Sequence, residues 1–389
     1  MIVSLTEAAL AEAGGKAAVL GALARAGFPV PAGFVVPVEA YRAATDGLDL
    51  AELRAVRRLI ESQPLPAELV REITEALTQL GGGAVAVRSS ASSEDTVGAS
   101  AAGQHDSFLG VDGPAAVAER VSATWGSLWS QRAIAYRSNS ADAPEMAVLI
   151  QRQVDAEVAG VLFTDGPETV IEASWGLGES VVRGLVTPDS FSVTADRVVG
   201  RRTGDKQTRI DGGITTAVPP DLRERLCLDD DQLIRLARLG QEVAAHLGGP
   251  QDIEFALENN AIWLLQARPV TAPLPQSTGP IGGSGDLRGT AGSPGVVSGP
   301  ARVVQGPDDF RRVGAGDILV CRFTDPAWTP LFGVVAGVIT ETGGVLSHAA
   351  IVAREHRIPA VLGVPAVMST LYDGQPLTVD GSAGTVAVG

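Results

Sequence analysis

Residues 340–361, TETGGVLSHAAIVAREHRIPAV, place a histidine where a helix is expected to begin. A glycine pair follows an apolar run, 334–339, that is typical of a buried strand. Ser347 is a residue type that caps helices, His348 follows it directly, and Pro359 prevents the helix from continuing. Backbone N–H groups and the positive end of the helix dipole then face the imidazole, which favours its neutral form and an attached phosphoryl group. The stretch therefore predicts a nucleophilic histidine.

The same stretch resembles the phosphohistidine motif of the phosphoenolpyruvate synthase and pyruvate phosphate dikinase family. In that motif a histidine follows a Gly-Gly turn and precedes Ala-x-x-x-Ala-Arg-Glu and Ile-Pro-Ala. The resemblance implies that His348 is the catalytic residue, whereas a lone histidine is more often a capping or packing residue. Leu346 departs from the motif, because the two enzymes carry threonine there. A hydrophobic residue at this position is closer to the related rifampin phosphotransferases, which weakens an inference that pyruvate is the acceptor.

Composition sets the broad class of the protein. The 389 residues suffice for two or three domains with buried cores, and a hydrophobic content of 45% fits a globular protein. No apolar run approaches the roughly 20 residues of a membrane span, and the N-terminus lacks a basic region followed by an apolar one, so we expect a cytoplasmic protein without a membrane partner. The net charge of −15 argues against nucleic acid as a partner. Cys227 and Cys321 are far apart and predict neither a disulfide framework nor a zinc site.

Residues 14–34 begin with Gly-Gly-Lys and continue as a small-residue helix pattern. Glycines before a helix let backbone amides approach a phosphate, and a lysine there supplies positive charge. Three such residues alone are a weak signal. The whole run, however, is similar to the opening of the family's ATP-grasp domain, whose lysine contacts the nucleotide. The resemblance gives that role to Lys16.

A predicted strand, 84–87, leads into Arg88 and a run of small residues. An arginine at a strand end, followed by serine and glycine, offers bidentate donors and backbone amides to a triphosphate. A surface loop is the alternative. The run is also similar to the family pattern, which implies that Arg88 binds phosphate and that Gly103 and Ser107 belong to a loop that closes over the nucleotide. Ala101 stands where the family has phenylalanine, so the loop is expected to pack differently.

Two apolar runs, 146–154 and 158–164, are predicted to be adjacent strands. In an ATP-grasp fold the connector between such strands pairs with adenine, and the resemblance implies that Gln151 lines this site with Val154 nearby. The helical pattern over 114–138 carries Trp125 and Trp129 at i, i+4, which we interpret as core residues.

The motif over 171–191 also matches the family. Its carboxylates, Glu172 and Glu179, are expected either to lie near the metal or only to shape a loop, and the sequence does not decide between these. Lys206 is a candidate phosphate contact, with a structural role as an equal alternative.

A long predicted helix, 229–246, precedes an alternating pattern over 251–271 that indicates a hairpin. Glu254 and Gln266 are expected on its two strands, and Arg268 shares a face with Gln266. A carboxylate and an amide oxygen suit Mg²⁺, which prefers oxygen ligands. An ordinary amphipathic hairpin would also be polar on one face, but the family's ATP-grasp domain ends with this Glu followed by Gln-x-Arg-Pro. The resemblance thus implies Mg²⁺ at Glu254 and Gln266, and phosphate at Arg268.

Together these patterns predict an α/β (α+β) chain with an ATP-grasp domain over 1–271, a flexible linker over 272–286 and a swivelling phosphohistidine domain over 287–389. Pro, Gly and Ser dominate the linker, and its expected span of roughly 20 Å makes swivelling feasible. Short β-prone runs surround the His348 helix: 301–304, 317–320, 334–339, 376–379 and 385–388. No third, acceptor-binding domain is expected within these residues.

The resemblance implies an ATP-dependent dikinase or phosphotransferase that phosphorylates its own His348, releases AMP and passes the phosphoryl group to a small organic acceptor. The acceptor is expected either on a separate partner protein or captured directly between the domains. One alternative is an antibiotic-inactivating enzyme of the rifampin phosphotransferase type. A second, from another class, is a non-catalytic phosphocarrier or regulatory subunit that acts on a partner protein.

Overall fold

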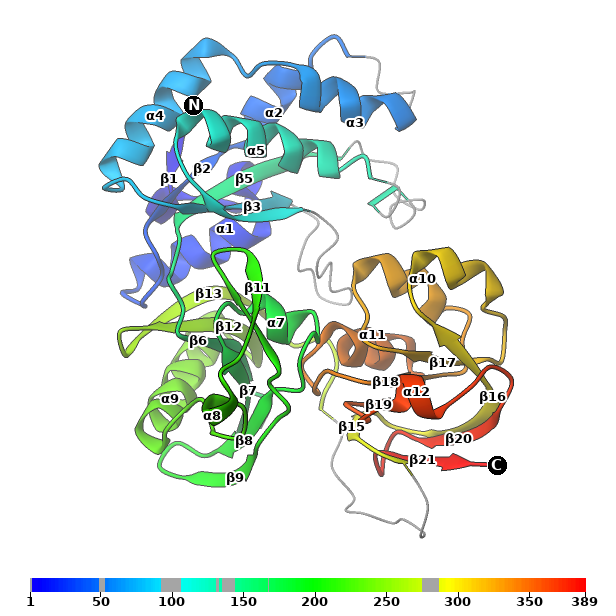
Figure 1. Cartoon of the computed structure of the whole chain (residues 1–389). Coiled ribbons are helices and arrows are strands. Elements are labelled where there is room, and N and C mark those ends of the chain that lie inside the picture. Colours follow the sequence, from blue (N-terminus) through cyan, green and yellow to red (C-terminus); the bar gives the residue numbers. More distant parts are fainter. Residues whose placement is uncertain are drawn as a thin grey trace. The chain divides into compact units, whose positions relative to one another are not determined.

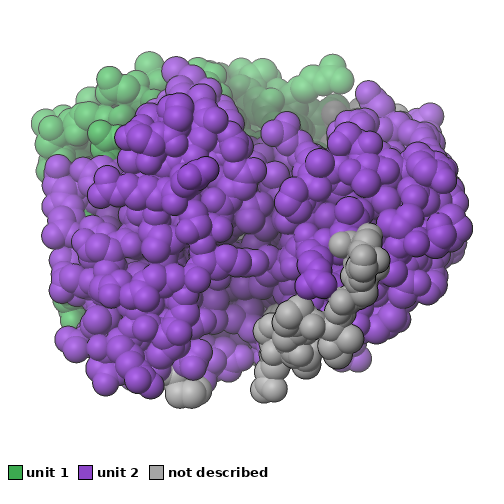
Figure 2. Space-filling model, turned by 60° about the horizontal axis from the view of Figure 1, so that its bottom comes forward, with its two compact units in different colours: residues 1–155, 261–269 green, residues 156–260, 270–389 purple. Residues whose placement is uncertain are grey.

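The computed structural model describes residues 2–48, 53–91, 106–130, 133–134, 144–166, 168–274 and 287–389. By its internal contacts the chain divides into two compact units (Figure 2). Unit 1 contains Met1–Asp155 and Ala261–Pro269, and unit 2 contains Ala156–Asn260 and Val270–Gly389. Most of the predicted linker, 275–286, lies outside the described residues. No helix in the described part of the chain is long and apolar enough to cross a membrane.

Unit 1 is built on a five-stranded sheet in the order β1-β2-β5-β3-β4 (Figure 1). Each neighbouring pair is antiparallel. The strands are β1 (Val3–Ser4), β2 (Gly33–Val36), β3 (Val85–Ala91), β4 (Ser107–Val111) and β5 (Met146–Arg152), and β13 (Ala261–Pro269) also belongs to this unit. The helices are η1 (Leu5–Glu7), α1 (Leu10–Arg25), α2 (Val38–Thr45), α3 (Leu53–Ser62), α4 (Ala67–Gln79) and α5 (Pro114–Ser127).

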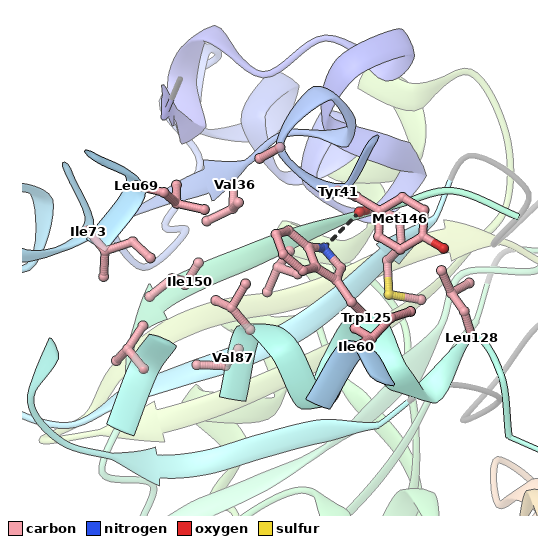
Figure 3. Close-up of a cluster of buried hydrophobic side chains, with 14 of the residues drawn as sticks. Val36, Tyr41, Ile60, Leu69, Ile73, Val87, Trp125, Leu128, Met146 and Ile150 are labelled. Carbon is pink, nitrogen blue, oxygen red and sulfur yellow. Dashed lines mark hydrogen bonds between the residues drawn. The ribbon is translucent and has the colours of Figure 1, made fainter. Parts of the chain in front are cut away.

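The core of unit 1 lies between the sheet and α2 to α5, and Figure 3 shows Trp125 among its apolar side chains. Trp125 is fully buried, and its indole N–H donates to the carbonyl of Met146 at 3.1 Å. Trp129 is also buried and donates to the hydroxyl of Tyr41 at 3.2 Å. The prediction that both tryptophans are core residues is confirmed, although the helix predicted over 114–138 ends at Ser127.

The first half of unit 2 is an antiparallel sheet in the order β12-β6-β7-β8-β9. Its strands are β6 (Val158–Phe163), β7 (Thr169–Trp175), β8 (Asp189–Val193), β9 (Val198–Arg202) and β12 (Gln251–Glu258), with a separate ribbon of β10 (Thr208–Asp211) and β11 (Ile214–Ala217). The helices are α7 (Glu179–Val182), α8 (Pro220–Arg223) and α9 (Asp230–Leu247).

The long helix α9 begins and ends where its sequence predicts. Asp229 and Gln232 form a reciprocal capping box, in which each side chain accepts from the other residue's backbone N–H. Gly248 ends the helix with a left-handed φ of 83°. Asn259 and Asn260, with φ of 50° and 62°, then form the turn between β12 and β13 that the hairpin prediction requires.

The runs 146–154 and 158–164 form β5 and β6, but the prediction that they are adjacent strands is wrong. β5 lies between β2 and β3 in unit 1, and β6 lies between β12 and β7 in unit 2. Both edges of each strand are therefore occupied by other partners. The connector between them passes from one unit to the other.

The second half of unit 2 has strands in the order β14-β21-β20-β16-β17-β18-β19-β15, with β16 to β19 parallel. Their bounds are β14 (Leu287–Arg288), β15 (Thr290–Ser293), β16 (Val296–Val304), β17 (Ile318–Cys321), β18 (Gly337–Thr340), β19 (Ala360–Leu362), β20 (Pro376–Asp380) and β21 (Thr385–Val388). The helices are η2 (Pro307–Arg312), η3 (Pro326–Trp328), α10 (Thr329–Phe332), α11 (His348–His356) and α12 (Val367–Thr370).

All five strands predicted in this half are present, but β18 begins three residues later than the apolar run. The N–H groups of Val334 and Val335 both donate to the carbonyl of Leu331, so the run first continues the turn of α10. The strand begins only at Gly337.

Lys206 is a structural residue, and the interpretation of it as a phosphate contact is wrong. Its side chain is fully buried and donates to Asp189 Oδ1 at 2.5 Å. Asp189 is equally buried and also accepts from the backbone N–H groups of Gly204 and Cys227, each at 2.8 Å. The pair therefore ties β8 to two loops, and burial raises the pKa of the neighbouring Cys227 thiol well above its usual range.

Replacement of Lys206 by methionine keeps the length of the side chain and removes its charge. Because Asp189 would then be a buried carboxylate without its cation, we expect a loss of about 3–5 kcal/mol in the free energy of unfolding. Urea denaturation followed by circular dichroism measures this loss.

The exposed pair between Arg201 and Asp230 provides the control. Arg201→Met is expected to cost less than about 1 kcal/mol, because exposed ion pairs contribute little. Equal destabilisation by the two substitutions would contradict the structural role of Lys206.

Candidate active site

The Gly-Gly-Lys segment makes a tight turn against β3. Gly14 interrupts α1 with φ 74° and ψ 171°, so the regular helix begins after it. A Cβ at Gly14 would lie 2.0 Å from the carbonyl oxygen of Ser90, and this close approach requires glycine. The hydroxyl of Ser90 donates to the carbonyl of Ala13 at 2.6 Å and accepts from the N–H of Ala17 at 3.0 Å. Lys16 therefore occupies the first turn of the regular helix, beside β3.

Arg88 lies on the same strand, two residues before Ser90. The prediction placed it just beyond a strand over 84–87, but β3 continues through Ala91 because its pairing with β5 continues. One guanidinium nitrogen of Arg88 donates to the carbonyl of Leu265 in β13 at 2.5 Å. Ser107 is the first residue of β4 and the register partner of Arg88, so the prediction that it belongs to a loop is wrong, because strand pairing with β3 begins at this residue. Gly103, the other predicted loop residue, lies outside the described residues.

The remaining predicted nucleotide residues of unit 1 are buried polar or apolar groups. Gln151 of β5 pairs in register with Gly33 and Ala86, and its amide donates to the carbonyl of Pro31 at 3.1 Å. Val154, Gln266 and Arg268 are also buried. Gln266 and Arg268 share one face of β13, the strand whose carbonyl Arg88 contacts and against which α1 also lies.

The structure thus gathers three cationic side chains, Lys16, Arg88 and Arg268, onto elements of unit 1 that contact one another. Backbone amides of a glycine turn lie beside them. Such a set can neutralise a polyphosphate, because cations and amide donors replace the water that hydrates the phosphate oxygens.

The two predicted metal ligands are on different units, since Glu254 is on β12 in unit 2 and Gln266 is on β13 in unit 1. Their joint role as Mg²⁺ ligands therefore stays a prediction. Their donor atoms, a half-buried carboxylate and an amide oxygen, are those that Mg²⁺ prefers. Among the described residues no group of three or more His, Cys, Asp or Glu side chains could hold a metal ion.

His348 is the first residue of α11, and Ser347 is at the N-cap position, as predicted. The Ser347 hydroxyl donates to the carbonyl of Gly344 at 2.8 Å and does not cap a helix N–H. Thr324 Oγ1 lies 2.9 Å from His348 Nδ1, and Thr329 Oγ1 lies 3.4 Å from Nε2. These hydroxyls orient the ring at the positive end of the helix.

The imidazole of His348 is only 5% exposed, and the edge of the Phe332 ring packs against it at a centroid distance of 6.3 Å. A ligand therefore reaches a ring nitrogen only after a local rearrangement. The contact of Nε2 to Thr329 is longer than the contact of Nδ1 to Thr324 and is therefore the weaker of these two.

Glu172 of β7 binds the turn that precedes His348. The carboxylate is fully buried, with Oε1 accepting from the N–H of Val345 and Oε2 from the N–H of Leu346, both at 2.9 Å. Burial raises the pKa of Glu172, and the two N–H donors, Arg202 and Arg354 only partly offset it. Glu172 therefore holds the turn that contains Val345 and Leu346.

The side chain of Leu346 packs into unit 2 and is 1% exposed. It joins an apolar cluster with Val161, Phe163 and Val181. Its hydrophobic character is thus explained by contact with β6 and α7.

Two known protein families match parts of this chain. Residues 10–278 match the family described as "Pyruvate phosphate dikinase, AMP/ATP-binding domain", and residues 313–384 match "PEP-utilising enzyme, mobile domain". The chain belongs to the pyruvate phosphate dikinase family. Its fold is α/β, with an ATP-grasp-type domain and a PEP-utilising mobile domain.

Several relatives match nearly the whole chain. The "Probable phosphoenolpyruvate synthase" of Methanothermobacter thermautotrophicus is 38% identical over 97% of this chain and 61% of its own length. The protein of the same name from Archaeoglobus fulgidus is 37% identical, and the "Phosphoenolpyruvate synthase" of Aeropyrum pernix is 36% identical, each over 97% of this chain and 56% of the relative. The chain thus spans little more than half the length of these relatives.

Sequence reasoning missed the groups that surround the family's motif residues. Thr324, two residues before η3, and Thr329, the first residue of α10, both contact the imidazole. No spacing in the sequence connects these threonines with His348. Arg354 was predicted only as part of the motif. It is buried, donates to the carbonyls of Gly292 and Val345, and has its pKa lowered by burial to about 10, so it stays charged at neutral pH.

Substitution of Gly14 by alanine tests the turn that positions Lys16. The new Cβ would overlap the Ser90 carbonyl and occupy a positive-φ position. We expect a loss of about 1–3 kcal/mol in the free energy of unfolding and an ATP affinity at least tenfold lower. Equilibrium binding of ATP and urea denaturation measure the two effects.

Gly27→Ala is the matched control, because Gly27 also has a positive φ but a Cβ there would meet nothing within 4 Å. It should reproduce the backbone strain alone and leave ATP affinity unchanged. If Gly14→Ala binds ATP as tightly as Gly27→Ala, the turn is not part of the nucleotide site.

The raised pKa of Glu172 predicts a pH dependence of stability. The group contributes fully below its ordinary pKa of 4.5 and loses that contribution as the pH rises through the raised native value. Compared with Glu172→Gln, the wild-type protein should therefore lose free energy of unfolding as the pH rises above 4.5. A difference between the two proteins that is flat, or that grows with pH, would contradict this.

Proposed function

We propose that this chain is an ATP-dependent phosphotransferase of the dikinase type that phosphorylates its own His348. The observation that carries the proposal is the position of His348 at the N-terminus of α11, with hydroxyl contacts at both ring nitrogens. The cationic set of unit 1 and the phosphoenolpyruvate synthase names of the relatives support it.

The negative charge of the triphosphate determines which groups the proposed reaction needs. A nucleophilic imidazole approaches a triphosphate with about four negative charges only when those charges are neutralised and the phosphates are held in line. Lys16, Arg88 and Arg268 supply positive charge, and the turn at Gly14 supplies backbone amides. Gln151 and Val154 are proposed to line the adenine site, with Gly103 on a loop over the nucleotide and Ser107 on β4 opposite Arg88.

Glu254 and Gln266 are the proposed Mg²⁺ ligands. Their oxygen donors fit the ion, which would neutralise phosphate charge when bound. The roles proposed for the side chains of unit 1 are to bind and orient the triphosphate. Thr324 and Thr329 are proposed to hold the imidazole in the orientation and protonation state from which it attacks.

We propose three successive steps for the reaction. A ring nitrogen of His348 forms a bond to Pβ, the bond from Pβ to the α,β-bridging oxygen breaks, and AMP leaves with that oxygen. The pyrophosphoryl group then loses its γ-phosphoryl to water or to phosphate, which yields phosphate or pyrophosphate. The oxygen of an acceptor next attacks phospho-His348 and regenerates the imidazole.

The names of the relatives favour an acceptor whose product is phosphoenolpyruvate, and therefore an enol oxygen of pyruvate. Leu346 does not oppose this, because it is buried against β6 and α7. We propose a swivelling movement of residues 287–389 about the segment 272–286 that carries phospho-His348 to the acceptor. The acceptor would be bound by a further protein or domain, or between the domains of this chain.

Labelling with ATP tests the proposal. With [β-³²P]ATP and Mg²⁺ we expect acid-labile label on the protein and one AMP per labelled chain, whereas [γ-³²P]ATP should leave no stable label. His348→Ala should reduce labelling by a factor of at least about 10³, because the nucleophile is lost. The same variant should still bind ATP.

His356→Ala is the control, since His356 is exposed at the other end of the same helix. It should label like the wild-type protein. Nucleotide binding without AMP formation would refute the proposed function and favour a non-catalytic phosphocarrier or regulatory role.

A further inference from the structure

The sheet of unit 2 presents a defined face to the turn before His348. Glu254 of β12 pairs with Val161 of β6, and Val161 pairs with Glu172 of β7. Directly opposite residues of antiparallel strands project from the same face, so these three side chains form one row. Since adjacent strands lie about 4.8 Å apart, Glu172 and Glu254 are roughly 10 Å apart.

The turn over 343–346 packs on this row of side chains, and we call this contact the seat of the turn. Glu172 binds the N–H groups of Val345 and Leu346, and the Leu346 side chain packs on Val161. A Cβ at Gly344 would lie 2.3 Å from both carboxylate oxygens, so the absence of a side chain there is what lets the carboxylate reach the two amides. The glycine of the motif thus serves a contact with Glu172.

Further contacts fix the turn from either side. The N–H of Gly343 donates to the carbonyl of Val186 at 3.1 Å, and the hydroxyl of Thr342 donates to the carbonyl of Gly184 at 2.6 Å. Buried Arg354 of α11 interacts electrostatically with Glu172 and with Asp252, which precedes Glu254 by two residues on β12. Charge and apolar contact therefore both hold α11 to the face that carries Glu254.

A contact made through the buried carboxylate of Glu172 can separate more easily than a purely apolar contact. Separation of the turn from the sheet returns the charges of Glu172 and Arg354 to water, and this hydration offsets much of the attraction lost. An apolar contact of the same area would gain no hydration of charged groups when it separates.

We propose that Glu172 is a positioning residue, which seats the turn before His348 on the sheet face beside Glu254 and so defines the arrangement in which His348 accepts its phosphoryl group. This inference rests on the proposed function. Glu172 acts through the backbone of Val345 and Leu346 and does not contact the reacting atoms. Transfer to the acceptor takes place after the seat has opened.

Glu172→Gln tests the proposal with three measurements. The amide keeps one acceptor oxygen but turns an NH₂ group towards the other backbone N–H. We expect hydrogen exchange at the amides of Val345 and Leu346 to become at least tenfold faster. The rate of His348 labelling from [β-³²P]ATP should fall at least tenfold, and the Kd of a non-hydrolysable ATP analogue should stay within twofold of the wild-type value.

Gly344→Ala approaches the same contact from the other side and should reproduce all three results. Two controls match the variants. Glu341→Gln alters a carboxylate that accepts from the backbone N–H of Met368 within its own half of unit 2. Gly333→Ala adds a Cβ whose nearest neighbour is 3.7 Å away. Both should exchange and label like the wild-type protein, and circular dichroism checks that every variant is folded.

Each combination of results either supports or contradicts the proposed role of Glu172. Faster exchange with slower labelling and unchanged nucleotide affinity supports the proposal. Faster exchange with unchanged labelling overturns the assignment of the seated arrangement to phosphorylation, and unchanged exchange overturns the role of Glu172 altogether. If the wild-type protein does not label, the proposed function fails, and the exchange measurement still shows whether Glu172 holds the turn.

Discussion

The hydrogen bonds from two consecutive backbone amides to the Glu172 carboxylate are the interaction on which the arrangement of unit 2 depends. Hydrogen bonds to a charged group contribute about 1.5–3 kcal/mol each, and an unsatisfied buried carboxylate would cost more. The contact is possible only because Gly344 has no side chain. It fixes the turn from which α11 starts, and with it the backbone of His348.

The same principle applies at the Gly14 turn of unit 1. There the carbonyl of Ser90 lies where a side chain would be, and the Ser90 hydroxyl bridges the two sides of the turn. In both units a glycine lets an oxygen of a neighbouring strand approach the backbone, and a residue with proposed chemistry, Lys16 or His348, follows within four positions. The glycines of both motifs therefore allow close contact between segments that are distant in the sequence, in addition to forming turns.

The parts of the fold that depend on local signals could be predicted from the sequence. The start of α11 at His348 follows from a glycine pair, a serine and a later proline, and the ends of α9 follow from Asp229 and Gly248. Arg88, Lys16 and Gln151 were recognisable because they lie within long motif matches. Gly103 lies outside the described residues, and the ligand roles of all these positions stay predictions.

What could not be predicted depends on pairing between distant segments. Nothing in the runs that form β5 and β6 shows that their edges are taken by β2, β3, β12 and β7. Lys206 was a candidate phosphate contact because it lies in a Gly-Asp-Lys turn, and the sequence does not show that its side chain is buried against Asp189. Glu172 contacts residues more than 170 positions away, and only the three-dimensional structure connects it with the phosphohistidine motif.

The most direct test of the central claim, attack by His348 on Pβ, follows an oxygen atom. ATP that carries ¹⁸O in the α,β-bridging position is incubated with the protein, and the nucleotide product is analysed by mass spectrometry. The account predicts AMP that retains the ¹⁸O, formed together with phosphorylated His348. Formation of ADP, or of AMP without the label, would contradict it.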